Sequence, residues 1–177
     1  DITASIIEKS YKRFLKIMEN HLSNFPFLFG YRPSSADFAI YGQLTQLIGL
    51  DPTSRAVAHK LSLRTTAWVD NMEDMSGLNP NNNPWETFET LSENMKPILQ
   101  EIGRVYVPAL LANSRALENG EEVWETEIDG SKWSQNTFNY QAKCLQWINA
   151  EFFSLSSDDQ NRILDLFSGT GCEKLIM

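Results

Sequence analysis

The chain has 177 residues, 42% of them apolar, which suffices for one well-packed core with a small appendage. Its formal net charge of −8 disfavours nucleic acids and anionic membranes as partners, because both repel a negatively charged protein. No apolar run approaches the ~20 residues that cross a bilayer, and no basic-then-apolar leader is visible.

Three helices are predicted in the first 75 residues. Apolar side chains recur at helical spacing over residues 3–22, with charged side chains opposite, which predicts a one-sided amphipathic helix. Residues 35–49 are apolar on nearly all sides and therefore predict a buried helix. Asp51 and Pro52 end that run, and a new apolar stripe predicts a third helix over residues 54–74.

A polar break separates these helices from the rest of the chain. Residues 76–84 read Ser-Gly-Leu-Asn-Pro-Asn-Asn-Asn-Pro, and this concentration of turn-forming residues predicts a loop. The apolar stripe from Phe88 to Ile102 then predicts a helix that Pro97 kinks. A further helix is expected over residues 107–118, because a proline in its first turn lacks only an amide that would be unpaired anyway.

Residues 122–134 carry the only signal for strands. Asp129-Gly130 stands between two runs rich in β-branched and aromatic residues, which predicts a small hairpin. Two strands alone are marginally stable, so this hairpin should lie on helices. Two more helices, over about 136–153 and 157–167, close the chain. The predicted fold class is therefore all-α, with a small β-hairpin near residues 122–134.

The most informative motif lies before the second helix. Residues 27–38 read Phe-Leu-Phe-Gly-Tyr-Arg-Pro-Ser-Ser-Ala-Asp-Phe. Ser34 and Asp37 have the spacing of a capping box, in which the Ser34 hydroxyl accepts a hydrogen bond from the amide of Asp37. The Asp37 carboxylate reaches back to the amide of Ser34, so that two otherwise unpaired donors at the helix start are satisfied.

This order of Leu-Phe-Gly, Arg-Pro-Ser and Ala-Asp-Phe blocks resembles the signature of the helical C-terminal domain of glutathione S-transferases. The resemblance covers about residues 5–75 and includes Trp68-Val69-Asp70 in the closing helix. It implies a glutathione-S-transferase C-terminal-like helical bundle, in which the capping box starts the central buried helix and serves folding. Residues 85–177 resemble an extended C-terminal region of some members.

The resemblance also implies how the chain is organised. We expect one helical domain over residues 1–177, with a transferase-like core at 1–75, a loop at 76–84 and a helical extension at 85–177. In the family, a preceding thioredoxin-like domain binds glutathione and activates its thiol, and the helical domain lines the pocket for the electrophile. That preceding domain is an expected partner that is absent from this chain. A homodimer is also expected, because members commonly pair.

Two functions of different classes follow from the resemblance. In the first, the chain is the substrate-side part of a protein that conjugates glutathione, or transfers a thiol, to a hydrophobic electrophile. Glutathione is then a co-substrate of the full-length protein, and the chain alone is expected to be inactive. In the second, the chain is a non-catalytic helical protein-interaction module. A βαβ segment encoded upstream favours the first, and a self-associating helical face without such a segment favours the second.

The sequence supplies no residue that qualifies as catalytic, cofactor-binding or metal-ligating. His21 and His59 are the only histidines, and neither has a partner at motif spacing, so both are expected at the surface or at helix ends. From the family only Ser34 and Asp37 can be carried over, as a structural capping box.

The aromatic residues allow one candidate site. Tyr106, Trp124 and Trp133 are candidates to line an apolar pocket, because aromatic side chains combine a large apolar area with a polar tip. Trp68 and Trp147 lie at helical spacing with apolar residues and are expected in the core.

The two cysteines suggest in which cellular compartment the protein resides, but they do not identify a reaction. Cys144 lies beside Lys143, but its helical stripe predicts that it packs as a small apolar residue. Cys172 lies in a glycine-rich tail and is expected to be exposed. With no ligand spacing and no glycosylation sequon, the chain is predicted to be cytoplasmic. Because it begins at Asp1 without methionine, we expect a processed or trimmed product or a fragment.

Overall fold

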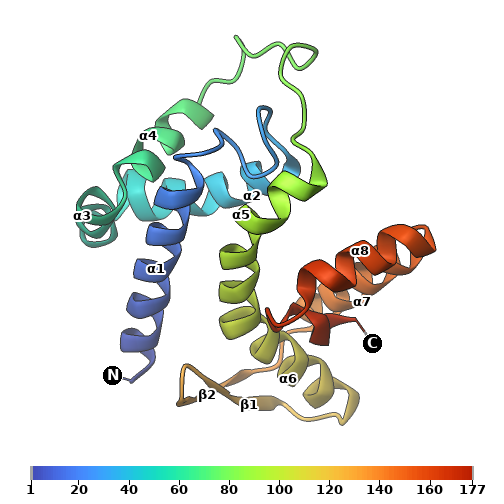
Figure 1. The fold of residues 1–177 in the computed structure, drawn as a ribbon. Coiled ribbons are helices and arrows are strands. Elements are labelled where there is room, and N and C mark those ends of the chain that lie inside the picture. The colour runs from blue at the N-terminus through green and yellow to red at the C-terminus, as the bar shows by residue number, and fades with distance from the viewer. Residues whose placement is uncertain (1, 177) are drawn as a thin grey trace. The chain divides into compact units, whose positions relative to one another are not determined.

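The computed structural model describes residues 2–176 and is mostly helical, with one small antiparallel sheet (Figure 1). The predicted all-α class with a small hairpin is confirmed at this level. The chain divides into two compact units, one formed by Tyr11–Met95 and the other by the first ten residues together with residues 96–177. We call these the Tyr11–Met95 unit and the C-terminal unit. The boundary falls inside two helices, whereas the sequence suggested a subdivision at the loop 76–84.

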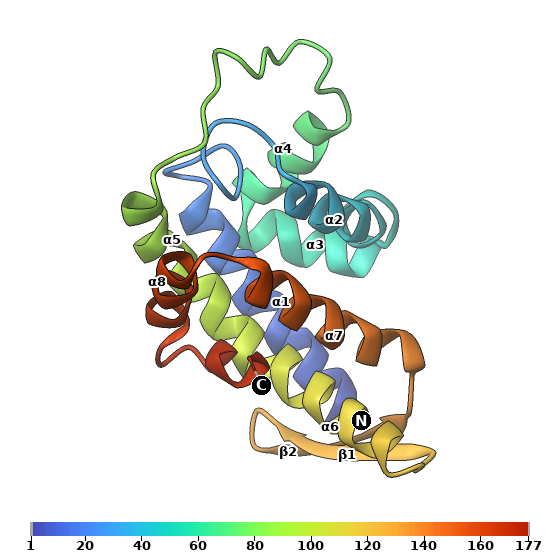
Figure 2. The ribbon, with the colours of Figure 1, turned by 90° about the vertical axis from the view of Figure 1, so that its right-hand side faces the viewer.

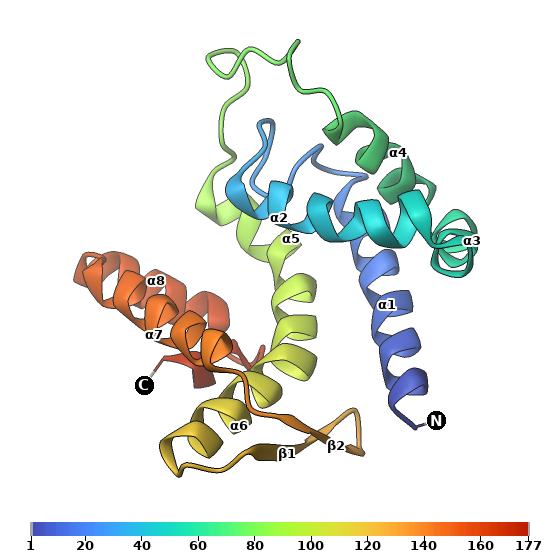
Figure 3. The ribbon, with the colours of Figure 1, turned by 180° about the vertical axis from the view of Figure 1, so that it is seen from behind.

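Figure 3 shows the helices of the Tyr11–Met95 unit. Buried side chains of these helices form an apolar core. The elements of this unit are α1 (Ile2–His21, from residue 11), α2 (Ser35–Leu44), the π-helical turn η1 (Thr45–Leu50), α3 (Pro52–Leu61), α4 (Leu63–Met72) and the first half of α5 (Phe88–Glu101). The buried residues of its core come from every helix up to α4 and from the segment before α2: Leu15, Phe27, Leu44, Ile48, Ala58, Trp68, Val69 and Met72. Trp68 therefore lies in the core, as predicted.

The prediction of a single helix over residues 54–74 is wrong, because the structure has two helices that meet at Ser62. Ser62 is the N-cap of α4, and its hydroxyl accepts a hydrogen bond from the amide of Thr65 at 3.2 Å. The same hydroxyl donates to the carboxylate of Glu19 at 2.9 Å. A buried serine with these partners stabilises a new helix start instead of continuing the previous helix.

The prediction that residues 35–49 form a helix buried on nearly all sides is also wrong. Asp37, Leu44 and Ile48 are buried, but Phe38 is 49% exposed and the neighbouring side that carries Gly42 is open as well. A Cβ atom added at Gly42 would meet no atom within 4 Å. Apolar composition all around a helix therefore does not ensure that every side has a neighbour within the chain.

The C-terminal unit combines helices with the predicted hairpin (Figure 2). After α5 the chain continues through η2 (Ile102–Tyr106), α6 (Val107–Glu118), β1 (Val123–Ile128), β2 (Ser131–Asn136), α7 (Asn139–Ser154), α8 (Ser157–Phe167) and η3 (Cys172–Leu175). Asp129 and Gly130 both have positive φ, 52° and 72°, as a two-residue hairpin turn requires. The hairpin lies along α6 and thereby gains the support that an isolated pair of strands lacks.

The chain tail packs closely against the junction of α5 and η2. A Cβ atom added at Gly103 would lie 2.0 Å from the carbonyl oxygen of Thr170, so only glycine permits this approach of two backbones. Cys172 follows directly and is buried, and its thiol donates a hydrogen bond to the carbonyl of Leu99 at 3.2 Å. The expectation that Cys172 is exposed is therefore wrong, because the glycine-rich tail folds back onto α5.

Candidate functional site

The capping box of α2 is a buried polar cluster. The hydroxyl of Ser34 accepts a hydrogen bond from the amide of Asp37 at 3.3 Å, and the Asp37 carboxylate accepts one from the amide of Ser34 at 2.8 Å. The second carboxylate oxygen of Asp37 accepts a hydrogen bond from the amide of Leu28 at 2.9 Å. Asp37 is fully buried, so its donors fix it in place. This cluster ties the start of α2 to the Leu-Phe-Gly segment and leaves no oxygen facing solvent for a reaction.

The Leu-Phe-Gly segment and the residues after it also contact residues 84–86, at the end of the loop 76–84. The amide of Glu86 donates to the carbonyl of Phe29 at 3.0 Å, and the amide of Tyr31 donates to the carbonyl of Pro84 at 3.2 Å. The Arg32 guanidinium lies 4.6 Å from the centre of the Trp85 ring, within the range of a cation–π contact. No sequence pattern predicts these contacts, because their partners are more than fifty residues apart.

Two of the three predicted pocket aromatics belong to the packing of the hairpin. Trp124 is 3% exposed and packs against Ala112 and Ala116 of α6. Trp133 is partly buried and joins the same cluster. The strand register pairs Trp133 with Thr126, two residues from Trp124, so both rings lie on the face of the sheet toward α6. Neither lines the two pockets described below.

Tyr106 has a different environment from the two tryptophans. It ends η2 and is 40% exposed. Partial burial and the nearby Cys144 thiol together raise the pKa of Tyr106 above its ordinary value. Tyr106 lies near Cys144 of α7 and does not belong to the cluster that holds Trp124 and Trp133, so the structure does not bring the three predicted aromatics together. Cys144 is half-buried, in agreement with its predicted position near an apolar face.

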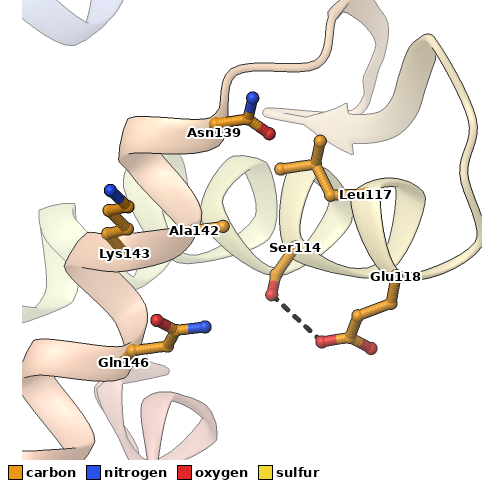
Figure 4. Close-up of a pocket in the computed structure, with 7 residues that line it drawn as sticks. All are labelled: Ser114, Leu117, Glu118, Asn139, Ala142, Lys143 and Gln146. Atoms are coloured by element: carbon orange, nitrogen blue, oxygen red, sulfur yellow. Dashed lines mark hydrogen bonds between the residues drawn. The ribbon is translucent and has the colours of Figure 1, made fainter.

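A pocket of about 450 Å³ lies between α6 and α7 (Figure 4). The α6 side contributes Ser114, Leu117 and Glu118, and the α7 side contributes Asn139, Ala142, Lys143 and Gln146. Ser114, Ala142 and Gln146 point into the gap between the helices in the close-up. The Ser114 hydroxyl donates to the Glu118 carboxylate at 3.3 Å, one helical turn away. The volume of this pocket is in the range of ligand pockets, and its lining combines amide, hydroxyl and charged groups with apolar surface.

A smaller pocket of about 350 Å³ lies between α6 and β1. It is mostly polar and mixes both signs of charge, with lining residues Ala112, Arg115, Ala116, Asn119, Glu121, Glu125 and Thr126. Glu125 is paired with Lys132 across the hairpin at 2.8 Å. Because its charges are mutually compensated, this pocket provides no strong field for a charged ligand.

The most unusual surface of the C-terminal unit is a row of three aromatic rings on and just before α7. Phe138, Tyr140 and Trp147 are 56%, 57% and 53% exposed. The ring centres of Phe138 and Tyr140 are 6.3 Å apart, and those of Tyr140 and Trp147 are 5.7 Å apart. We call these three residues the α7 aromatic row. The prediction that Trp147 lies in the core is wrong, because α7 buries the side that carries Leu145 and Phe152 instead.

His21 is the last residue of α1, and so lies at a helix end as predicted; it is buried, and its Nε2 donates to the carbonyl of Phe27 at 3.2 Å. Within residues 2–176 no three His, Cys, Asp or Glu side chains gather in a way that could hold a metal ion. None of the helices in this range is long and apolar enough to span a bilayer. Comparison with models of known families, with curated proteins and with solved structures found no match to the chain.

Proposed function

We propose that the Tyr11–Met95 unit is a helical domain of the glutathione S-transferase C-terminal type, and that the chain is the substrate-side part of such a protein. The observation that carries this proposal is the buried Asp37. Its carboxylate joins the capping box to the Leu-Phe-Gly segment through the amides of Ser34 and Leu28. The motif that resembles the family thus contains a buried hydrogen-bonded carboxylate of this unit, which supports the proposal.

The exposed side of α2 is a second argument for the proposal, because it can accept another domain or chain that packs against it. In the family this helix is central and buried, but here its exposed side carries uncharged residues only: Ser35, Phe38, Ala39, Gly42, Gln43 and Gln46. Small residues permit the close approach of another backbone. An uncharged side on a chain of net charge −8 fits contact with protein better than contact with water. We assign the cover to a thioredoxin-like domain or to the second copy of a homodimer.

In this proposal the chemistry is divided between two domains. The thioredoxin-like domain would bind glutathione and activate its thiol, and the helical domain would hold the hydrophobic electrophile. We expect no glutathione site in this chain, because the tripeptide needs both backbone hydrogen bonds and an anchor for its carboxylates, and no sequence segment is recognised that supplies them. The chain alone should therefore neither bind glutathione nor conjugate it.

The experiment that tests this proposal compares two proteins. One is the product of the complete coding sequence that contains Asp1, and the other is the present chain. We expect the complete product to conjugate glutathione to chlorodinitrobenzene and the present chain to show no such activity. Titration calorimetry of the present chain with millimolar glutathione should give no saturable heat. A coding sequence without a βαβ glutathione-binding segment, or saturable binding by the present chain, would overturn the proposal.

A second candidate, a non-catalytic helical interaction module, is favoured by the α7 aromatic row. Three rings that are each more than half exposed form an apolar surface of the kind that proteins use for contacts with partners. Sedimentation velocity separates the alternatives in part. Concentration-dependent association through the open side of α2 supports a missing cover, and a clean monomer over a hundredfold concentration range favours a self-contained module.

A further inference from the structure

The chain contains a single Asn-Gly pair, Asn119-Gly120, which lies at the junction of α6 and β1. In such a pair the asparagine side chain is open to attack by the next backbone nitrogen, because glycine has no Cβ atom that shields its amide. Both residues are exposed, and a Cβ atom added at Gly120 would meet no atom within 4 Å. Water therefore reaches the pair, and packing does not hinder a reaction there.

The reaction open to this pair is deamidation. The amide nitrogen of Gly120 bonds to the side-chain carbonyl carbon of Asn119, and the side-chain nitrogen leaves as ammonia together with the proton of the attacking amide. The product is a closed succinimide ring. Water then opens the ring at either carbonyl, which leaves aspartate or isoaspartate at position 119. The net change is the replacement of an amide by a carboxylate, with water consumed and ammonia released.

The folded conformation of Asn119 prevents this ring from closing. A closed ring needs the Gly120 nitrogen and the Asn119 Cβ atom to be nearly eclipsed about the Cα–C bond. Asn119 is the C-cap of α6 and has a ψ angle of −5°. Because Cα is tetrahedral, this angle turns the Gly120 nitrogen roughly 120° away from the Cβ atom. The backbone of Asn119 must therefore rotate before the nitrogen can attack.

Two hydrogen bonds of the helix end oppose this rotation. The amide of Gly120 donates to the carbonyl of Leu117 at 3.1 Å, and the amide of Glu121 donates to the carbonyl of Ala116 at 2.8 Å. With Gly120 at a φ of 72°, these bonds form the Schellman motif that ends α6. The attacking nitrogen is thus also the donor of one of them. Deamidation therefore requires the last turn of α6 to open.

The product fits the closed helix end poorly. The side-chain nitrogen of Asn119 donates to the Glu121 carboxylate at 3.2 Å, whereas a carboxylate at position 119 has no donor and repels Glu121. The partial negative charge at the C-terminal end of α6 also disfavours an added carboxylate. When the ring opens to isoaspartate, the backbone between α6 and β1 becomes longer by one carbon atom.

We propose that Asn119 is a site of spontaneous deamidation whose rate is controlled by opening of the α6 C-terminus, and that the product favours the open form. This inference does not depend on the glutathione transferase-like function, because every residue it uses belongs to the C-terminal unit.

The test is peptide mapping by mass spectrometry after incubation of the full chain in mildly alkaline, heavy-oxygen water. In urea, Asn119 should deamidate faster than every other asparagine and take up one heavy oxygen atom. In the folded chain the rate at Asn119 should be lower by about tenfold or more, since only the opened helix end reacts. Equal rates in the two conditions, or no preference for Asn119 in urea, would overturn the proposal.

Arg115→Gly shows which opening matters. Arg115 is exposed in the last turn of α6, where glycine weakens the helix. The variant should raise the rate at Asn119 several-fold in the folded chain and leave the rate in urea unchanged. Arg162→Gly is the matched control, because Arg162 is an exposed arginine of α8. Equal acceleration in both variants would assign the reaction to unfolding of the whole unit and would contradict control by the α6 C-terminus.

Asn119→Asp reproduces the product directly. Hydrogen exchange of the Gly120 and Glu121 amides should be several-fold faster in this variant than in the parent chain, because the added charge favours the open helix end. Asn119→Gln keeps a neutral amide and should exchange like the parent chain. Equal exchange in the aspartate variant and the parent chain would overturn the proposed effect of the product.

Discussion

The chain contains two Ser-x-x-Asp motifs at helix starts, one in each unit, and they share two of their local hydrogen bonds. The amide of Asp37 donates to the Ser34 hydroxyl at 3.3 Å, and the amide of Asp159 donates to the Ser156 hydroxyl at 3.2 Å. In both pairs the serine hydroxyl also donates to the carboxylate, at 2.6 Å and 2.8 Å. Only the α2 motif adds the reciprocal hydrogen bond from the amide of Ser34 to the Asp37 carboxylate, at 2.8 Å, and so forms a complete capping box.

Their surroundings differ. Asp37 has no exposed surface and also accepts a hydrogen bond from the amide of Leu28, nine residues earlier. The side chain of Asp159 is 51% exposed, and its other oxygen lies 3.4 Å from the similarly exposed Arg162. Spacing therefore predicts the bond from the aspartate amide to the serine hydroxyl in both motifs but not the reciprocal bond, and burial decides how much the loss of these bonds destabilises the fold.

The largest effect is expected for Asp37→Ala. The substitution removes a helix cap, which is worth about 0.5–2 kcal/mol, and leaves the buried amide of Leu28 without a partner, at a further ~1–3 kcal/mol. We expect the free energy of unfolding to fall by about 2–4 kcal/mol, measured from urea denaturation. Combined with Ser34→Ala, which alone should lower stability by about 0.5–2 kcal/mol, the loss should be less than the sum. An unchanged midpoint in both single variants would refute the structural role of the box.

In the C-terminal unit the chain tail approaches the backbone at Gly103 closely, and Gly103→Ala tests what this contact contributes to stability. Its added Cβ atom would lie 2.0 Å from the Thr170 carbonyl oxygen and 2.9 Å from the Cα atom of Gly171, so the backbones must separate. We expect a loss of about 1–3 kcal/mol in the free energy of unfolding, as for other overpacked sites. Gly42→Ala is the matched control, because it lies on the open side of α2. It should be neutral or stabilising by about 0.5–1 kcal/mol. A similar loss in both variants would show that close approach at Gly103 is not the cause.

The sequence predicted those features that depend on a few consecutive residues. The capping box at Ser34, the hairpin turn at Asp129-Gly130 and the start of α6 before Pro108 all follow from local backbone chemistry, and the structure shows each of them. The helix break at Ser62 was missed because its decisive partner, Glu19, is 43 residues away. The cap bond from the amide of Thr65 is local, but a serine three residues before a threonine does not by itself distinguish a helix break from a continuous helix.

The same limit applies to the candidate site. The sequence shows that aromatic residues are abundant, but not which of them have neighbours. Trp124 was a pocket candidate and is buried against α6, whereas Trp147 was expected in the core and lies exposed in the α7 aromatic row. Both outcomes depend on which side of a strand or helix meets another element. This is set by long-range packing and not by spacing along the chain.

The side chain of Glu19 is more exposed than Asp37 and less exposed than Asp159, and its contribution to stability depends on pH. Its carboxylate accepts hydrogen bonds from the amide of Arg64 at 3.0 Å and from the Ser62 hydroxyl, and it is paired with the Arg64 guanidinium. Although desolvation acts to raise the pKa of Glu19, these hydrogen bonds and the Arg64 charge hold it below its ordinary value of 4.5. The stability that Glu19 contributes is therefore complete above pH 4.5 and is lost as the pH falls through the lowered pKa.

Glu19→Gln measures this contribution directly. The parent chain should be more stable than the variant at neutral pH, and the difference should shrink as the pH falls below 4.5. Urea midpoints at several pH values between neutral and strongly acidic would show the convergence. Because the Glu19 side chain is 28% exposed, we expect a smaller effect than for Asp37→Ala. A difference that grows at low pH would contradict the assigned direction of the pKa shift.

The smallest effect is expected at the exposed motif. Ser156→Ala removes the hydroxyl that accepts from the amide of Asp159, but water can replace it at this exposed position. We expect a loss of about 0.5–1 kcal/mol in the free energy of unfolding, at the low end for helix caps. Ser157→Ala, one residue further along and also exposed, provides a control for the loss of a hydroxyl without a cap. If Ser156→Ala proved as damaging as Asp37→Ala, burial could not be what separates the two motifs. The stability of the C-terminal unit would then depend on the cap of α8 as strongly as the other unit depends on Asp37.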